Sequence, residues 1–245
     1  MNSLEDDRYW MGSAKSPDTY QLISPLGGGG EGEVWKGVVP LSESGRGLVA
    51  IKILPPNDGE DQDSWSRYSH LLRSLDHPGL VRVIDVFLGS AKHRAGTVEA
   101  TEVDTTEVPA APGMHRYVVM KLVEGVTLRE WLDENPEAPI SHRLRALMMV
   151  ASALDEIHSG RQTGVPVAHG DVKPSNIIMR KDGSSVLVDL GLTTIADGQG
   201  RTGRSRPYAA PELFGPIVRA TQKLLQRLGP PTLQDGEQST TLLGE

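Results

Sequence analysis

Four short apolar runs near the start of the chain have the length and composition of strands. They are rich in valine, leucine and isoleucine and are bounded by glycine, proline or polar residues, as strands usually are. The runs cover residues 20–26, 34–40, 48–54 and 81–88. Between the last two, apolar residues recur every three or four positions, which predicts a helix over residues 61–75. The residues of this stripe are Trp65, Tyr68, Leu72 and Leu75.

Two helices and a hairpin are expected further along the chain. A short helix begins after Thr127, whose side chain is a good N-cap, and a longer helix begins near Ser141. The longer helix carries an apolar stripe that predicts core packing: Leu144, Leu147, Met148, Ala151, Leu154, Ile157 and His158. Residues 176–188 predict a strand, a tight turn at Gly183 and a second strand.

A glycine-rich segment lies between the first two strand-like runs. Its register is Gly27-x-Gly29-x-x-Gly32-x-Val34. Glycines allow a backbone to approach phosphate oxygens without interference from a Cβ. A dinucleotide-binding turn would lead into a helix, whereas a strand-like run follows here, so a β-hairpin over a nucleotide is favoured over that turn and over a flexible linker.

The predicted hairpin over residues 176–188 would gather three polar side chains. It holds Asp171 and Asn176 at one end and returns Asp189 beside them. Mg²⁺ takes oxygen ligands and usually keeps substrate phosphates in its shell. One carboxylate would be left to take a proton from an attacking hydroxyl.

Composition narrows the function classes. The chain of 245 residues has 25 basic and 32 acidic residues, a net charge of −7 and no cysteine. No basic run stands out, so no nucleic-acid partner is expected, and disulfides and cysteine-based zinc sites are excluded. The acidic N-terminus is unlike a secretory signal, and no stretch approaches the roughly 18 apolar residues of a membrane span. A cytoplasmic location is predicted.

Three motifs together resemble the eukaryotic-like protein kinases found in bacteria. The segment His169-Gly170-Asp171-Val172-Lys173-Pro174-Ser175-Asn176 resembles their catalytic loop, Asp189-Leu190-Gly191 their metal-binding triplet, and Ala210-Pro211-Glu212 the end of their activation segment. The resemblance implies an α+β, bilobal fold with a small antiparallel sheet lobe plus one helix, and a mainly helical large lobe. It implies Mg-ATP-dependent phosphoryl transfer to serine or threonine hydroxyls of protein substrates.

The same resemblance implies a division of the chain. We expect a flexible N-terminus over 1–18, a small lobe over 19–124 with a polar, disordered insertion at 89–113, a partial large lobe over 125–228 and a disordered tail over 229–245. Residues 215–228 read as one amphipathic helix. Because several expected helices are not recognisable after Glu212, the large lobe is predicted to be incomplete. A truncated product, a fragment and a form completed by a partner chain all fit this pattern.

Residue roles follow from the resemblance. Asp171 would orient the acceptor hydroxyl and take its proton, Lys173 would neutralise charge on the transferred phosphoryl, and Asn176 and Asp189 would hold Mg²⁺. His169 would be a packing residue. ATP would be bound by Leu26, Gly27, Gly29, Gly32, Val34, Ala50, Lys52, Met120, Lys121 and Val123, with Met120 as gatekeeper and the backbones of Lys121 and Val123 facing adenine.

Two positions depart from the family pattern. Tyr68 stands where the family has a helix glutamate that pairs with the strand lysine, here Lys52. Either Asp189 replaces that partner, or the helix register differs, or Lys52 is poorly placed. Gly170 replaces an arginine that binds activation-loop phosphate, so activity is predicted not to depend on phosphorylation of Thr202 or Ser205.

Two other functions remain open at this point. An ATP-binding pseudokinase that serves as a scaffold or regulator would explain Tyr68 and the missing helices. A small-molecule phosphotransferase is the third alternative, because His-Gly-Asp followed by Asn176 also resembles the aminoglycoside and choline kinase group. Lys173-Pro174 and the glycine segment favour the protein kinase.

Overall fold

The computed structural model describes residues 8–29, 32–41, 45–56, 62–101, 113–190 and 194–195. The chain divides into two compact units, residues 1–205 and 206–245, and every described residue belongs to the first. The predictions for Thr202, Ser205, the Ala-Pro-Glu triplet, the helix at 215–228 and the tail therefore lie outside the described residues.

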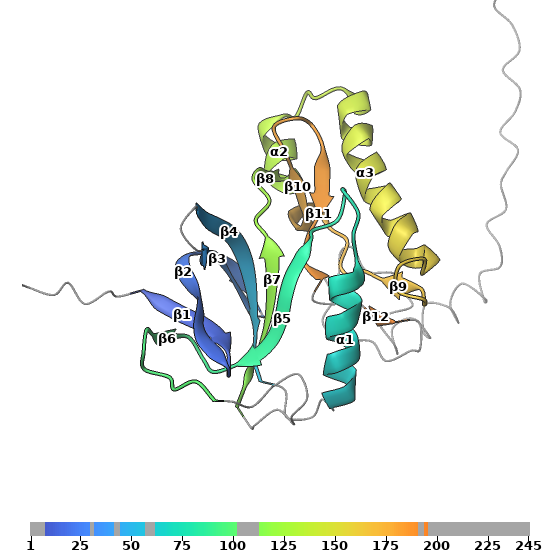
Figure 1. Cartoon of the computed structure of the whole chain (residues 1–245). Helices are drawn as coiled ribbons and strands as arrows, with labels where there is room; N and C mark the ends of the chain where they lie inside the picture. Colours follow the sequence, from blue (N-terminus) through green and yellow to red (C-terminus); the bar gives the residue numbers. More distant parts are fainter. Residues whose placement is uncertain are drawn as a thin grey trace, which may run out of the picture. The chain divides into compact units, whose positions relative to one another are not determined.

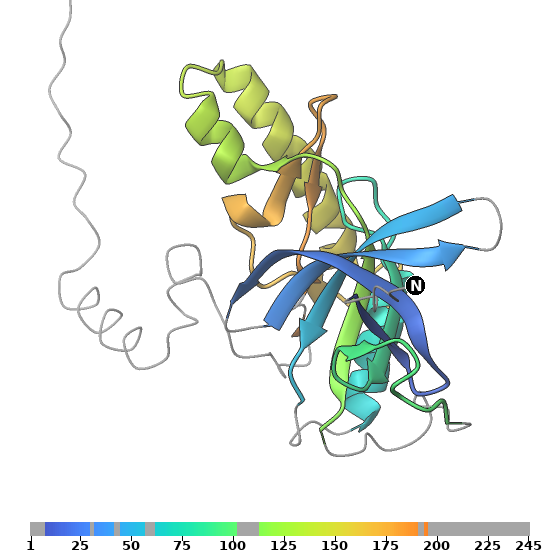
Figure 2. The same ribbon diagram turned by 90° about the vertical axis from the view of Figure 1, so that its left-hand side faces the viewer.

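Seven strands form a curled antiparallel sheet (Figure 1, Figure 2). They are β1 (Tyr9–Ser13), β2 (Ser16–Gly29), β3 (Gly32–Leu41), β4 (Gly45–Leu54), β5 (Val83–Gly89), β6 (His93–Arg94) and β7 (His115–Lys121). Their order across the sheet is β5-β7-β4-β3-β2-β1-β6. Helix α1 (Gln62–Ser74) lies beside β5, as Figure 1 shows.

The two faces of this sheet pack into different apolar clusters. Alternation along β4 places Ile51 and Ile53 in one cluster with Met11 and Tyr117, and Leu54 in the other with the apolar face of α1. The second cluster continues into the helices and hairpin of the large lobe. The expected strands and the helix over 61–75 are thus confirmed within the described ranges.

The prediction of a flexible N-terminus is wrong for residues 9–18. Strand β1 pairs with β2, with Trp10 opposite Gln21 and Met11 opposite Tyr20. Met11 is fully buried. The segment looks polar in sequence because it contributes one apolar face, which is all that a strand on a half-buried sheet requires.

The prediction of a disordered insertion is wrong for its first part. Strand β6 pairs with β1, and the Asp18 carboxylate accepts hydrogen bonds from His93 Nε2 at 2.9 Å and from the Gly96 N–H at 2.8 Å. Thr101 donates its N–H to the Ala14 carbonyl at 2.8 Å. The segment that follows β5 is therefore held by polar contacts, which hydrophobic periodicity does not detect. Residues 102–112 lie outside the described ranges.

Within its described residues, the large lobe contains two α-helices and three short pairs of strands. The helices are α2 (Leu128–Glu134) and α3 (Ile140–Ser159), and the strands are β8 (Val126–Thr127), β9 (Val167–Ala168), β10 (Ile177–Met179), β11 (Ser185–Leu187) and β12 (Thr194–Ile195). Strands β11, β10 and β8 form one antiparallel sheet, and β12 pairs with β9. The hairpin of β10 and β11 lies between α2 and α3 in Figure 1. The N-cap prediction is confirmed, because Thr127 and Glu130 form a capping box at the start of α2.

The predicted core stripe of α3 is displaced around the helix. The buried residues are Ala146, Val150, Ala153 and Ile157, whereas Leu144, Leu147 and Met148 are exposed, Met148 by 70%. Small side chains let β11 approach closely, and Ser185 Oγ donates to the Ala146 carbonyl at 2.6 Å. The prediction therefore holds only for Ile157 and for the partly buried Leu154. Hydrophobicity predicts large apolar residues on the core face, but the close approach of β11 selects small ones.

Candidate active site

A pocket of about 520 Å³ lies between the glycine hairpin and the β10–β11 hairpin. Nine of the ten residues predicted to bind ATP line it: Leu26, Gly27, Gly32, Val34, Ala50, Lys52, Met120, Lys121 and Val123. Gly29 pairs with Gly32 at the end of the same hairpin. The volume is within the range of small-molecule sites, and the wall is mainly apolar with a few polar groups at one end, as such sites usually are.

The glycine segment forms the upper wall as an antiparallel hairpin of β2 and β3, as predicted. Gly32 has a φ of +122°, and a Cβ there would lie 2.1 Å from the Ile53 carbonyl oxygen. Only glycine fits both this backbone conformation and this approach. The glycine at position 32 is therefore required to bring β3 against β4, in addition to any contact with a ligand.

The segment after β7 forms the back of the pocket. Met120 is buried and stands opposite Ala50 in the β4–β7 ladder. The Lys121 N–H donates to the Arg82 carbonyl at 2.9 Å. Any backbone hydrogen bond of Lys121 to a ligand must therefore use its carbonyl, whereas Val123 lies beyond the end of the strand.

Lys52 pairs with Asp189 across the pocket. Lys52 Nζ lies 2.5 Å from Asp189 Oδ1, and Lys52 is only 4% exposed. A buried lysine is unfavourable unless it is paired, so this contact explains how an apolar strand accommodates the charge. Of the three alternatives for Lys52, the structure favours Asp189 as its partner.

Tyr68 reaches the same segment from α1. Its hydroxyl donates to the Leu190 carbonyl at 2.8 Å, a buried hydrogen bond between residues 122 positions apart. Asp189 has a φ of +66°, a left-handed conformation that costs about 1–3 kcal/mol in a residue other than glycine. Leu190 is buried in the core on the far side of that bend. Lys52 and Tyr68 therefore hold the bend that aims Asp189 at the pocket.

A second cluster lies at the start of β10. Asn176 Nδ2 donates to both the carbonyl and the Oδ2 of Asp171, each at 2.9 Å, and Lys173 Nζ lies 2.6 Å from the same Oδ2. A 3-10 turn over Pro174–Asn176 makes this possible, because it brings Asn176 back beneath Asp171. The backbone carbonyl of Asn176 accepts a hydrogen bond from the Val188 N–H at 2.8 Å. This bond joins the cluster to the residue before Asp189.

His169 packs between the two clusters. Its Nε2 lies 3.1 Å from the Val188 carbonyl, and its Nδ1 lies 3.3 Å from the Asp171 N–H. A carbonyl can only accept and an N–H can only donate, so Nε2 carries the proton and the ring is neutral. Burial lowers the pKa of His169, which favours the same form. This geometry agrees with a packing role.

The predicted metal ligands line the same pocket. Asn176 and Asp189 both line it, together with Lys173. Both amide hydrogens of Asn176 are directed at Asp171, so the amide oxygen is the atom it offers to a ligand. Within the described ranges, no group of three or more His, Cys, Asp or Glu side chains is placed to hold a metal ion. A carboxylate and an amide oxygen nevertheless suit Mg²⁺, which usually completes its shell with water and phosphate.

Seven further lining residues were missed by the sequence analysis: Gly28, Val81, Leu122, Thr127, Ser175, Ile178 and Val188. A signal was available for Ile178. Its neighbours Ile177 and Met179 are buried in the core, so alternation along β10 turns Ile178 toward the pocket. The same period-two argument applied to both strands of the hairpin would have identified the floor of the pocket.

The described fold has two lobes, and the pocket lies under a glycine hairpin with several polar side chains in its wall. Comparison with known proteins gives the family: the family model for the protein kinase domain matches residues 20–224, and the chain belongs to this family. This match confirms the bilobal kinase fold and extends past Glu212, where the recognised motifs ended.

Individual relatives are named serine/threonine-protein kinases. The chain is 26% identical over 178 residues to the probable kinase PknB of Lactococcus lactis, covering 71% of this chain and 24% of the relative. It is 28% identical over 178 residues to PrkC of Bacillus subtilis, covering 71% and 23%. It is 31% identical over 189 residues to PknB of Mycobacterium tuberculosis, covering 74% and 25%. The chain thus spans about a quarter of the length of these relatives. Among its described helices, none has both the length and the apolarity that a membrane crossing needs.

Proposed function

We propose that the chain transfers the γ-phosphoryl group of Mg-ATP to serine or threonine hydroxyls of protein substrates. One observation carries the proposal: Lys52, Asp189, Lys173 and Asn176 all line one pocket, and the Asp171 carboxylate is bonded to the last two of them. The names of the relatives support the choice of serine and threonine.

The pocket has two parts that suit the two parts of ATP. Val34, Ala50, Met120 and Ile178 line an apolar slot that fits the flat adenine ring, with the Lys121 carbonyl and the Val123 backbone at its rim. The glycine hairpin covers the other end, where Lys52 would bind phosphate oxygens. When bound, Mg²⁺ would neutralise charge on the phosphates, and the Asn176 amide oxygen and the Asp189 carboxylate are the groups that would hold it.

Asp171 and Lys173 would act on the acceptor hydroxyl and the transferred group. As the hydroxyl oxygen bonds to the γ-phosphorus and the bond to the bridging oxygen breaks, Asp171 takes the hydroxyl proton. Lys173 lies beside Asp171, where its charge would balance the equatorial oxygens of the phosphoryl group. Asn176 holds Asp171 through one hydrogen bond to its carboxylate and one to its backbone carbonyl, so little rearrangement is needed at the moment of transfer.

Asp171→Asn tests this assignment. The variant keeps the shape of the side chain but cannot accept the proton, so phosphate incorporation into a generic protein substrate should fall by about 10²–10⁴-fold. ATP-induced thermal stabilisation should persist. Asp133→Asn, at an exposed position of α2 that does not line the pocket, is the matched control. Unchanged incorporation in Asp171→Asn would contradict the role of Asp171.

A pseudokinase is the second candidate, and a specific observation favours it. Tyr68 occupies the position of the family's glutamate, and Lys52 is already engaged by Asp189. Under this alternative, ATP would stabilise the protein but no phosphate would reach a substrate, in wild type as in Asp171→Asn. Wild-type transfer that is lost in Asp171→Asn would exclude it.

A further inference from the structure

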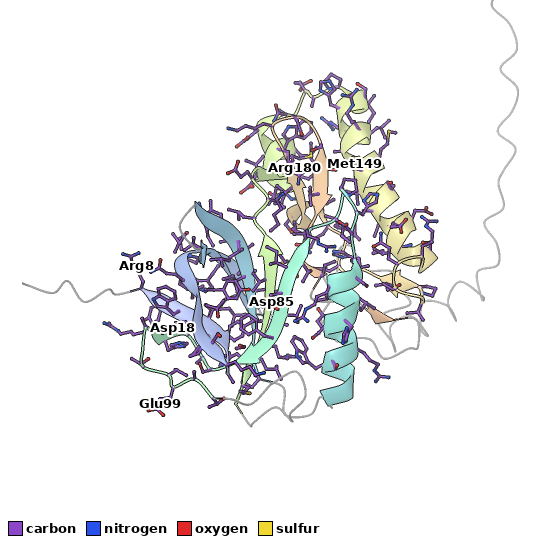
Figure 3. The ribbon with its side chains drawn as sticks, viewed as in Figure 1. Arg8, Asp18, Asp85, Glu99, Met149 and Arg180 are labelled. Carbon is purple, nitrogen blue, oxygen red and sulfur yellow. The ribbon has the colours of Figure 1, made fainter. Side chains whose placement is uncertain are left out.

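A second pocket, of about 620 Å³, lies in the large lobe. It is formed by the residues before α2, by α2 itself, by the start of α3 and by the turn that follows β10. Figure 3 labels Arg180 at this turn, between α2 and α3. The nucleotide-binding function proposed above does not use this pocket.

The two pockets share one wall. In the β8–β10 ladder, Thr127 pairs with Ile178, and both line the pocket of the active site. The next pair along, Val126 and Met179, lines the second pocket. Because side chains alternate across a strand, the two pockets lie on opposite faces of the same short ladder.

The lining of the second pocket is basic. His142, Arg145, Arg180 and Lys181 contribute to it, and Asp182 is the one acidic lining residue. The Asp182 carboxylate is engaged by Ser184, whose N–H and Oγ donate to it at 2.9 and 2.6 Å. None of the four basic residues forms an ion pair with a carboxylate among the residues that the structure describes. This concentration of positive charge runs against a chain whose net charge is −7.

Apolar surface accompanies the charge. Trp131 is half-buried against the core, and Val126 and Met179 lie at the base of the same pocket. Positive charge around an apolar base suits an extended peptide in which acidic residues flank one apolar side chain, since the charges meet at the rim and the side chain enters.

We propose that this pocket docks an acidic segment of the protein substrate. The proposal rests on the kinase function above and adds a recognition site to it. Strand β10 has three residues and therefore spans about 10 Å between this pocket and Asn176. A segment held here keeps the rest of the substrate close to Asp171, which raises its effective concentration at the catalytic cluster.

Fluorescence anisotropy on the full chain tests the docking site. The probe is a labelled peptide in which glutamates flank a central leucine, and its control has glutamine at every glutamate. We expect Arg145→Glu/Arg180→Glu to weaken binding of the glutamate peptide by about tenfold or more. The matched control is Lys15→Glu/Arg94→Glu, which makes the same change in net charge on exposed residues of the small lobe and should bind as wild type does. Arg145→Gln/Arg180→Gln serves if charge reversal prevents folding.

Equal binding by wild type and both pocket variants would overturn the proposal, as would equal affinity for the glutamine peptide. Tighter binding of a single-stranded oligonucleotide, lost in the same variants, would overturn the assignment to a peptide. With a substrate fused to the glutamate peptide, kcat/KM should be about tenfold lower for the pocket variant than for wild type. With the unfused substrate, the two proteins should have the same kcat/KM. ATP-induced stabilisation should be unchanged in that variant. If ATP stabilised neither wild type nor any variant, the proposed kinase function would be contradicted. The peptide-binding result would still decide whether the second pocket binds the acidic peptide.

Discussion

The two halves of the active site are assembled over different distances along the chain. Asp171, Lys173 and Asn176 lie within six residues and are brought together by one 3-10 turn. Lys52, Tyr68 and Asp189 come from a strand, a helix and the end of a hairpin, and their contacts join residues 137 and 122 positions apart. The first half matches the family pattern except at Gly170, whereas the second half has a tyrosine in place of the family's glutamate.

The long-range half of the site can accept a change of residue type that the local half cannot. In the local half, each polar group is tied to a neighbour in the same turn, so a change of residue type breaks the cluster itself. In the long-range half, Asp189 only has to be held in the right place. Tyr68 contributes to this by a hydrogen bond to the carbonyl of the next residue, Leu190, and not by an ion pair. Mutations that separate charge from position can therefore test the comparison.

Lys52→Met should have the largest effect. It removes the charge that pairs with Asp189 and would bind phosphate, so phosphate incorporation should fall by about 100-fold or more. The methionine keeps most of the apolar stem in the buried strand, so the melting temperature should change little. Incorporation assays beside Lys36→Met, a neighbouring lysine that does not line the pocket, supply the comparison. Activity within twofold of wild type would show that charge in this half is dispensable.

Tyr68→Phe should have an intermediate effect, because it removes only one hydroxyl. The Leu190 carbonyl loses its partner in a buried setting, which costs about 1–3 kcal/mol. A less firmly held Asp189 should raise the Mg²⁺ concentration needed for half-maximal activity several-fold. Tyr9→Phe, at an exposed position, should change neither quantity. A loss of stability with no change in the Mg²⁺ requirement would assign Tyr68 to packing alone.

The smallest expected effect is the contribution of His169 to the pH dependence of folding stability. Its folded pKa is lowered, so the unfolded state binds more protons just below the unfolded pKa of about 6.5. Stability is then complete above that value and falls as the pH drops through the folded pKa, by at most about 1.4 kcal/mol per pH unit for one proton. Urea unfolding gives the free energy of unfolding at each pH between about 5 and 7.5. This free energy should change less steeply with pH in His169→Gln than in wild type or in the exposed His158→Gln. Identical slopes in all three would contradict a neutral buried His169.

The sequence predicted the local half of the site well, because short-range geometry follows from the turn, the hairpin and Gly183. It left three alternatives for Lys52, namely Asp189 as its partner, a different helix register or a poorly placed lysine, since the pairing depends on how α1 and the β10–β11 hairpin are placed. It placed the stripe of α3 on Leu144, Leu147 and Met148, because hydrophobicity alone does not reveal that β11 needs the small Ala146 and Ala153. It missed β1 and β6 because polar contacts to Asp18 hold the edge of the sheet.

We propose that both halves of the site act on one Mg-ATP in one pocket. Isothermal titration of the full chain with ATP, with and without Mg²⁺, measures whether they do. We predict that Mg²⁺ strengthens ATP binding about tenfold or more in wild type and by much less in Asp189→Asn and Asn176→Ala, which come from the two halves. Equal strengthening in wild type and in either variant would contradict the claim.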